Sequence, residues 1–244
     1  MGTGVVYIMW PRWYILNRRR LMPTAVISVV LLLFLWGMAS FFRGFSGSEK
    51  ELFDKSLANT MNCSSYRYNV EVKQGGKETI TLVEGARVKP NRVHLKGAMQ
   101  KSQMEFIQID DNTYMKDPWS DRWFTLKGNL VAQSELFVTE FNPLGLFNFK
   151  DVPEIKKTGT ERVDGVKTVV IEMRPNVANP FLELKYTDFK FRVWVDPDER
   201  LIRRASMQAY MPGGSEGLVV DMRFWDFNEN IKISPPQDKG LEKQ

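Results

Sequence analysis

The sequence offers few side chains that could perform chemistry. His94 is the only histidine of the chain and Cys63 the only cysteine. A catalytic serine needs a histidine oriented by a carboxylate, and a structural zinc site takes four ligands such as cysteine and histidine. His94 is expected on a strand face beside two cations, Arg92 and Lys96, and so it suits neither role. The sequence therefore predicts no catalytic residue, no metal and no cofactor.

Two acidic clusters, at 110–112 and 196–199, have compositions that cation-binding loops also show. Each falls between two segments with strand patterns, and Asp, Asn and Pro are common in tight turns because they favour the turn backbone. No glycine-rich loop follows a strand and opens a helix, so the nucleotide-binding fingerprints are absent as well. We expect a protein that is not an enzyme.

Alternation of apolar and polar residues predicts an antiparallel sheet over most of the chain. In the first strand Tyr66, Tyr68, Val70 and Val72 share one face, and Asp-Gly at 164–165 is a strong hairpin signal. The fold class is α+β, mainly β: a strongly curved antiparallel sheet, as an open β-barrel or half-barrel, with a few helices over its apolar face. Strands are expected at 66–73, 79–88, 92–99, 104–109, 113–116, 122–126, 156–163, 167–173, 189–195, 201–210 and 218–227.

Two helices are expected to cover this sheet. Apolar residues recur every four positions from 52 to 61, after a capping box formed by Ser48 and Glu51. Cys63 is expected to end this helix as a small buried residue. A second helix is predicted at about 130–141, followed by an apolar loop at 142–149.

A transmembrane helix is expected at 21–43. Residues 21–42 carry no charge and are mostly apolar, and about 20 such residues in a helix cross the roughly 30 Å hydrocarbon core of a bilayer. Residues 37–39 resemble a signal-peptide cleavage site, but secretory apolar regions are usually shorter, at about 7–15 residues. Cys63 lies too far beyond the span to be the acylated cysteine of a lipoprotein signal. We favour an uncleaved signal anchor over a cleaved signal.

The distribution of charge sets the expected orientation. Arg12 and the arginines at 18–20 precede the span, against Arg43 alone after it, and the side with the positive excess stays in the cytoplasm. Residues 1–43 hold five of the 34 Lys and Arg residues and no acid, so the remainder has 29 charges of each sign. The net positive charge of the chain therefore comes from residues 1–43, and nucleic-acid binding is not expected.

These observations give four segments. We expect a short cytoplasmic N-terminus at 1–20, a transmembrane signal anchor at 21–43, an exported β domain at 44–230, and a loose polar tail at 231–244. The expected location is a bacterial cytoplasmic membrane, single-pass, with the main domain on the extracytoplasmic side.

The order of hairpins resembles a known family. The motifs are SSYRYNVEV after the first helix, IQIDDNTYMKDPWSDRWFTL, GTERVDGVKTVVIEM and FRVWVDPDERLIRRASM, within about residues 48–228. They resemble the outer-membrane lipoprotein carrier (LolA/LolB-like) superfamily and its relatives, the LppX/LprG-like lipoproteins. The resemblance implies an open barrel whose apolar concave face holds acyl chains under a helical lid.

Together with the predicted span, the resemblance predicts a membrane-anchored protein that binds a lipid-like or lipidated ligand, as a carrier, receiver or presenter. The alternative is a non-enzymatic envelope interaction or signalling module in which side chains fill the cavity. The expected partners are the membrane, through one span, and a lipid or lipoprotein ligand. The expected cavity lining comes from the middle strands, the second helix and the apolar loop: Phe106, Tyr114, Phe124, Leu136, Phe137, Phe141, Leu144, Leu146 and Phe147.

Overall fold

The computed structural model describes residues 49–127, 142–236 and 242–243, which belong to a compact unit at 46–244. The predicted cytoplasmic segment and span at 1–43 lie outside these residues, as does the predicted helix at 130–141. In the part of the chain that is described, no helix is both long and apolar enough to cross a membrane.

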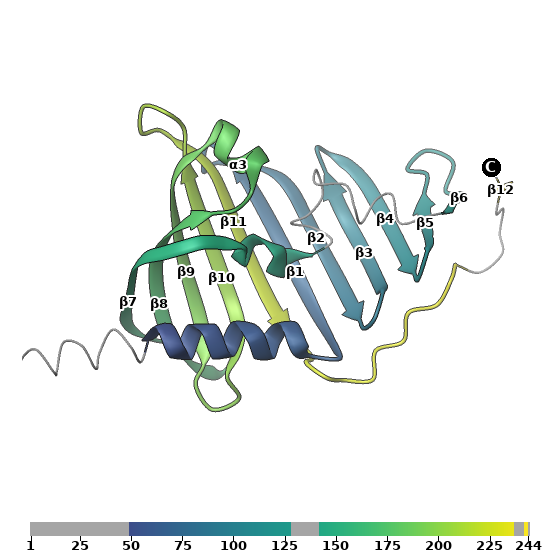
Figure 1. Ribbon diagram of the computed structural model, residues 1–244. Coiled ribbons are helices and arrows are strands. Elements are labelled where there is room, and N and C mark those ends of the chain that lie inside the picture. Colours follow the sequence, from purple (N-terminus) through teal and green to yellow (C-terminus); the bar gives the residue numbers. More distant parts are fainter. Residues whose placement is uncertain (1–48, 128–141, 237–241, 244) are drawn as a thin grey trace, which may run out of the picture. The chain divides into compact units, whose positions relative to one another are not determined.

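The strands form one open sheet, as predicted, and all pairs except β12–β6 are antiparallel (Figure 1). Consecutive strands are neighbours from β1 to β6 and from β7 to β11, and β1 pairs with β11 in the middle of the sheet. The strands are β1 (Ser65–Gln74), β2 (Glu78–Val88), β3 (Arg92–Met99), β4 (Ser102–Ile109), β5 (Asn112–Lys116), β6 (Trp123–Lys127), β7 (Phe149–Val163), β8 (Val166–Val177), β9 (Thr187–Asp196), β10 (Leu201–Tyr210), β11 (Glu216–Trp225) and β12 (Glu242–Lys243).

One face of the sheet, here called the covered face, carries the main hydrophobic core. It is the face of Tyr66 and Tyr68 on β1, and the register continues it through Phe106 on β4 to Met115 on β5 and Phe124 on β6. The opposite face carries charged side chains such as Glu84 and Lys96, together with two smaller apolar clusters around Ile107 and Val170.

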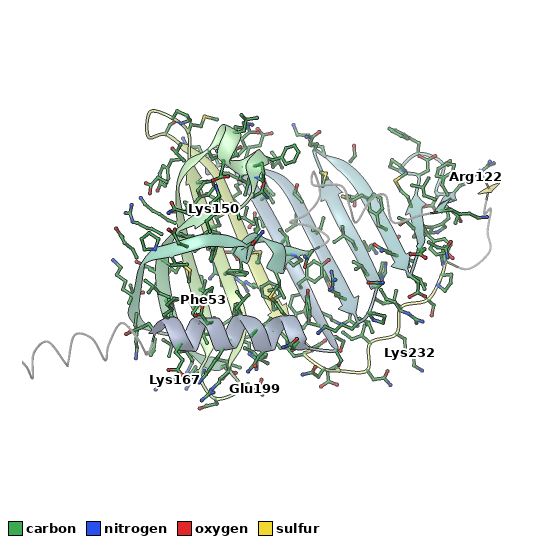
Figure 2. All side chains as sticks on the ribbon, viewed as in Figure 1. Phe53, Arg122, Lys150, Lys167, Glu199 and Lys232 are labelled. Atoms are coloured by element: carbon green, nitrogen blue, oxygen red, sulfur yellow. The ribbon has the colours of Figure 1, made fainter. Side chains whose placement is uncertain are left out.

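The helix at 49–62 lies across the covered face, in front of β8–β11 (Figure 1). Its buried residue Phe53 (Figure 2) stands 6.0 Å, between ring centroids, from Phe147 in the short 3-10 helix η2 (Pro143–Phe147). Phe149 at the start of β7 packs edge-on against Phe191 of β9, with centroids 5.0 Å apart. These aromatic rings join the helix, η2 and β7 into one cover over this half of the sheet.

A buried hydroxyl ties the helix to the sheet. Thr60 Oγ1 donates a 2.7 Å hydrogen bond to the carbonyl of Ser56 and accepts a 2.9 Å bond from the backbone N–H of Ile202. The β9–β10 pairing shifts register at Ile202. The Thr60 hydroxyl therefore accepts the hydrogen bond of the Ile202 N–H at a point where the strand pairing is irregular. Cys63 is buried directly after the helix, as predicted.

The segment after β11 packs on the opposite face of the sheet. Ile233 is buried against Ala86 and Ile107, with Ile231 beside it. Asn228 accepts a 2.8 Å hydrogen bond from the N–H of Ser64, which links this segment to the end of the first helix. The start of the predicted loose tail at 231–244 is therefore packed on the sheet, and β12 pairs with β6 further along.

Gly85 provides space for a buried ring, and Gly85→Ala is expected to destabilise the domain by about 1–3 kcal/mol. A Cβ atom at Gly85 would lie 2.2 Å from Cζ of Tyr68, a fully buried side chain with nowhere to move. Urea unfolding measures the change in the free energy of unfolding. Gly159→Ala is the matched control, because a Cβ there meets nothing within 4 Å. Equal losses from both substitutions would contradict the packing argument.

Candidate ligand-binding site

Four of the predicted lining residues come together in one apolar cluster. Phe106 of β4 and Leu144, Leu146 and Phe147 of η2 are all buried in the main core, although they are distant in sequence. Phe124 of β6 is half-buried on the same face of the sheet. Leu136, Phe137 and Phe141 lie outside the described residues.

Tyr114 lies on the other face from Phe106. On β5 it is Met115 that pairs with Phe106, whereas Tyr114 pairs with Ile107. Tyr114 packs in the second cluster, with Ile107 and Ile233 on the opposite face. Phe106 and Tyr114 therefore do not line a common cavity, and Met115 takes the place that the sequence analysis gave to Tyr114.

Side chains fill the space between the helix and the sheet. Phe147 stands 5.8 Å from Phe191 and 6.0 Å from Phe53, again between ring centroids. The sheet beneath them contributes Ile171 and Val193, whose side chains have no solvent exposure. The region directly under the helix is therefore a packed core.

A pocket of about 370 Å³ opens where the helix ends, and we call it the end pocket. Its volume lies within the usual range of ligand sites, about 300–1,000 Å³. The wall combines the helix end, β1, β2 and the residues around η2. The lining residues are Met61, Cys63, Ser64, Tyr66, Arg87, Lys89, Pro90, Asn142 and Leu144.

Arg87 is a positively charged residue on the covered face of β2. It pairs across the sheet with Tyr66 on one side and Val93 on the other, so it shares the covered face with both. Its side chain is half-buried, while Lys89 at the rim is exposed. In the described part of the chain, no ion pair joins either cation to a carboxylate. Arg87 was not among the residues predicted to form the site, although it lies on the same strand face as Val83.

Burial sets the protonation of the two titratable groups beside these cations. It raises the pKa of the Tyr66 phenol to about 12, while the positive charge of Arg87 acts in the other direction. Burial likewise raises the pKa of the Cys63 thiol. Because the thiolate is the reactive form of cysteine, Cys63 is poorly suited to act as a nucleophile.

A row of half-buried apolar side chains continues the covered face beyond the end pocket. We call this row, formed by Met104, Met115, Phe124 and Leu126, the apolar strip. Its strands, β4 to β6, lie away from the helix at 49–62, which covers the other half of the sheet (Figure 1). The strip and the end pocket therefore belong to one face, and both remain partly open.

A larger hollow of about 740 Å³ lies over β7 to β10 and is highly charged. Its charges are paired: Arg192 contacts Glu161 at 2.6 Å, and Arg204 contacts Asp221 at 2.6 Å. The two guanidinium groups also stack on the Trp194 ring, 5.0 and 4.5 Å from its centroid. This hollow is a network of ion pairs, whereas the cations of the end pocket have no ion pair among the described residues.

His94 lies outside the end pocket. Its Nε2 atom is 3.0 Å from Oε1 of Glu105 on the opposite face of the sheet. The side chain is partly exposed, in keeping with the prediction of a solvent-facing position, but it shares that face with a carboxylate as well as with Lys96.

The open antiparallel sheet, its helical cover and the order of its hairpins are those of the LolA/LppX-like fold, which confirms the resemblance inferred from the sequence. The lipoprotein LppX of Mycobacterium tuberculosis superposes with a TM-score of 0.56 at 19% identity, over 77% of this chain and 99% of that chain. LprF of Mycobacterium bovis gives a TM-score of 0.57 at 13% identity, over 78% and 97%.

A LolA-superfamily protein of Nitrosomonas europaea is matched over 78% of this chain and 96% of that chain, with 10% identity and a TM-score of 0.30. No family model and no curated protein matches the chain. At such low identities the solved structures define the fold alone.

Proposed function

We propose that this protein binds a lipid-like or lipidated ligand on the covered face of its sheet, while a single N-terminal span holds it in a bacterial cytoplasmic membrane. The observation that carries the proposal is the apolar strip, a set of half-buried apolar side chains on the same sheet face as a pocket. The domain would act outside the cytoplasm as a carrier, receiver or presenter of its ligand. LppX, which has the same fold, is a lipoprotein.

Burial of apolar surface is the expected driving force. An acyl chain gains about 0.8 kcal/mol for each CH₂ group that leaves water. Met104 and Met115 suit such a ligand, because unbranched thioether side chains adapt to irregular apolar shapes. The domain beyond the span carries equal numbers of acidic and basic residues, so long-range attraction contributes little and contact with the sheet decides the affinity.

A second candidate is an envelope interaction or signalling module without a lipid ligand. The packed core under the helix favours it, since Phe53, Phe147 and Phe191 already occupy the space that a deep barrel cavity would need. The two functions make different use of the apolar strip. A ligand-binding protein needs the strip accessible to acyl chains, whereas an interaction module does not.

Native mass spectrometry of the full chain, released from detergent micelles after purification from its membrane, separates the two functions. We expect masses of co-purified lipid on the unchanged protein and on Leu82→Glu, a control on an exposed position of the opposite face. Met104→Glu places a charge in the apolar strip and is expected to lose the added mass while melting normally. Absence of lipid from the unchanged protein would favour the interaction module, whereas equal lipid on both variants would show that the lipid does not lie on the apolar strip.

A further inference from the structure

We propose that the end pocket holds the anionic headgroup of the ligand, with Arg87 as the principal contact and Lys89 at the rim. This inference rests on the proposed lipid-binding function and names the chemical class of ligand: an acyl chain that ends in a carboxylate or a phosphate. The acyl chain would leave the pocket along the covered face and lie on the apolar strip.

The position of Arg87 supports this role. The cross-strand ladder that begins at Tyr66 and Arg87 continues through Val93 to Gln108, and then through Thr113 to Leu126 of the apolar strip. These positions share the covered face, and Val93, Gln108 and Thr113 are themselves buried, so an acyl chain from Arg87 would have to insert over them to reach Leu126. Leu144 of η2 supplies an apolar wall at the mouth of the pocket.

Among the described residues, Arg87 has no ion pair, in contrast to several other arginines of the sheet. Arg67 contacts Asp226 at 3.2 Å, Arg192 contacts Glu161 at 2.6 Å and Arg204 contacts Asp221 at 2.6 Å. A charge that leaves water is costly unless an opposite charge or hydrogen bonds compensate for it. Arg87 is half-buried with no ion pair among the described residues, so an external anion would supply the compensation.

The chemistry of the pocket fits an oxyanion. Among the described residues, its lining contains two cations and no acidic residue. The guanidinium group presents a planar fork of N–H donors that matches the two oxygens of a carboxylate or phosphate. Ser64 and Asn142 add a hydroxyl and an amide to the same lining. Partial enclosure strengthens these contacts, because the effective dielectric constant is lower than in open water.

The test compares ligands that differ in the headgroup alone. The full chain is placed in nanodiscs of a zwitterionic lipid, and binding of hexadecanoate, hexadecanol and a hexadecanoyl lysophosphatidate is measured against empty nanodiscs. Arg87→Gln is expected to weaken binding of the two anions about tenfold, the loss typical of one charge-assisted hydrogen bond. Hexadecanol is expected to bind both proteins within about twofold, which also shows that the variant is folded.

Two controls make the result specific. Arg92→Gln removes the same charge from an exposed position on the opposite face of β3 and is expected to change nothing. Arg87→Lys keeps the positive charge but lacks the paired N–H donors of the guanidinium group. This variant is expected to bind the anions more tightly than Arg87→Gln and less tightly than the unchanged protein. If Arg87→Gln folds poorly, added salt provides the second measurement: it should weaken hexadecanoate binding to the unchanged protein and spare hexadecanol.

The outcomes separate the headgroup inference from the proposed function. Equal affinity of Arg87→Gln and the unchanged protein for hexadecanoate would overturn the headgroup site and leave lipid binding intact. Failure of the unchanged protein to bind any of the three amphiphiles would overturn both. Inorganic phosphate that competes as strongly as the lysophosphatidate would show a site for free anions and would overturn the assignment to a lipid headgroup.

Discussion

Leu146→Asp is expected to lower the free energy of unfolding by at least about 3 kcal/mol. Leu146 is only 5% exposed and packs in the main core beside Phe147. Truncation of a buried leucine alone typically costs about 2–5 kcal/mol, and the carboxylate adds an unpaired buried charge. For a domain of this size the melting temperature should fall by roughly 10 °C, as measured by circular dichroism of the full chain.

Leu184→Asp is the matched control for this prediction. Leu184 lies on the short helix α3 (Pro180–Lys185) and is 88% exposed, so the same substitution there should change stability by less than about 0.5 kcal/mol. A normal melt of Leu146→Asp, together with loss of bound lipid, would show that Leu146 faces a ligand rather than a packed core. That result would extend the ligand site under η2.

The stability of the domain is expected to fall between about pH 10 and pH 12 because of Tyr66. Burial raises the pKa of this phenol to about 12 in the folded protein, against about 10 in an unfolded chain. The folded state thus favours the neutral form. Its contribution is complete below about pH 10 and is lost as the pH rises to about 12, with a total of roughly 2–3 kcal/mol.

Urea unfolding at a series of pH values measures this loss, and Tyr66→Phe provides the comparison. Phenylalanine keeps the ring and has no proton to lose, so the variant should decline less steeply over the same interval. Identical declines in the two proteins would show that Tyr66 is not the group responsible. Because Tyr66 lines the end pocket, the same titration should also weaken anion binding, since the phenolate would repel the headgroup.

Local sequence signals were sufficient to predict most of the strands. The bounds predicted for β3 and β10 agree with the structure, because their alternation is regular and their turns are well marked. The prediction for β7 began at residue 156, whereas the strand begins at Phe149. Its first half contains Pro153 and two of the three register shifts of the β7–β8 pair, and such irregularities weaken the alternation on which the prediction depends.

The candidate site was harder to predict because it depends on which face of each strand is covered. At β5 both faces look apolar: Met115 faces the main core, while Tyr114 packs with Ile233 from the C-terminal segment. Alternation cannot separate two faces that are both covered. Leu144 and Leu146, which were predicted to line a cavity, are buried in the main core as part of the apolar segment η2.

The pairing of β1 with β11 has a consequence for folding. Hairpins from β1 to β6 and from β7 to β11 can form between neighbours as the chain is made, but Arg67 finds its partner Trp225 only after β11 has been synthesised. Until then β1 presents an unpaired edge with Tyr68 and Val70, a surface prone to aggregation. A chain that ends before β11 should therefore require a holding chaperone, and the domain is expected to fold slowly because its final contact is so distant in sequence.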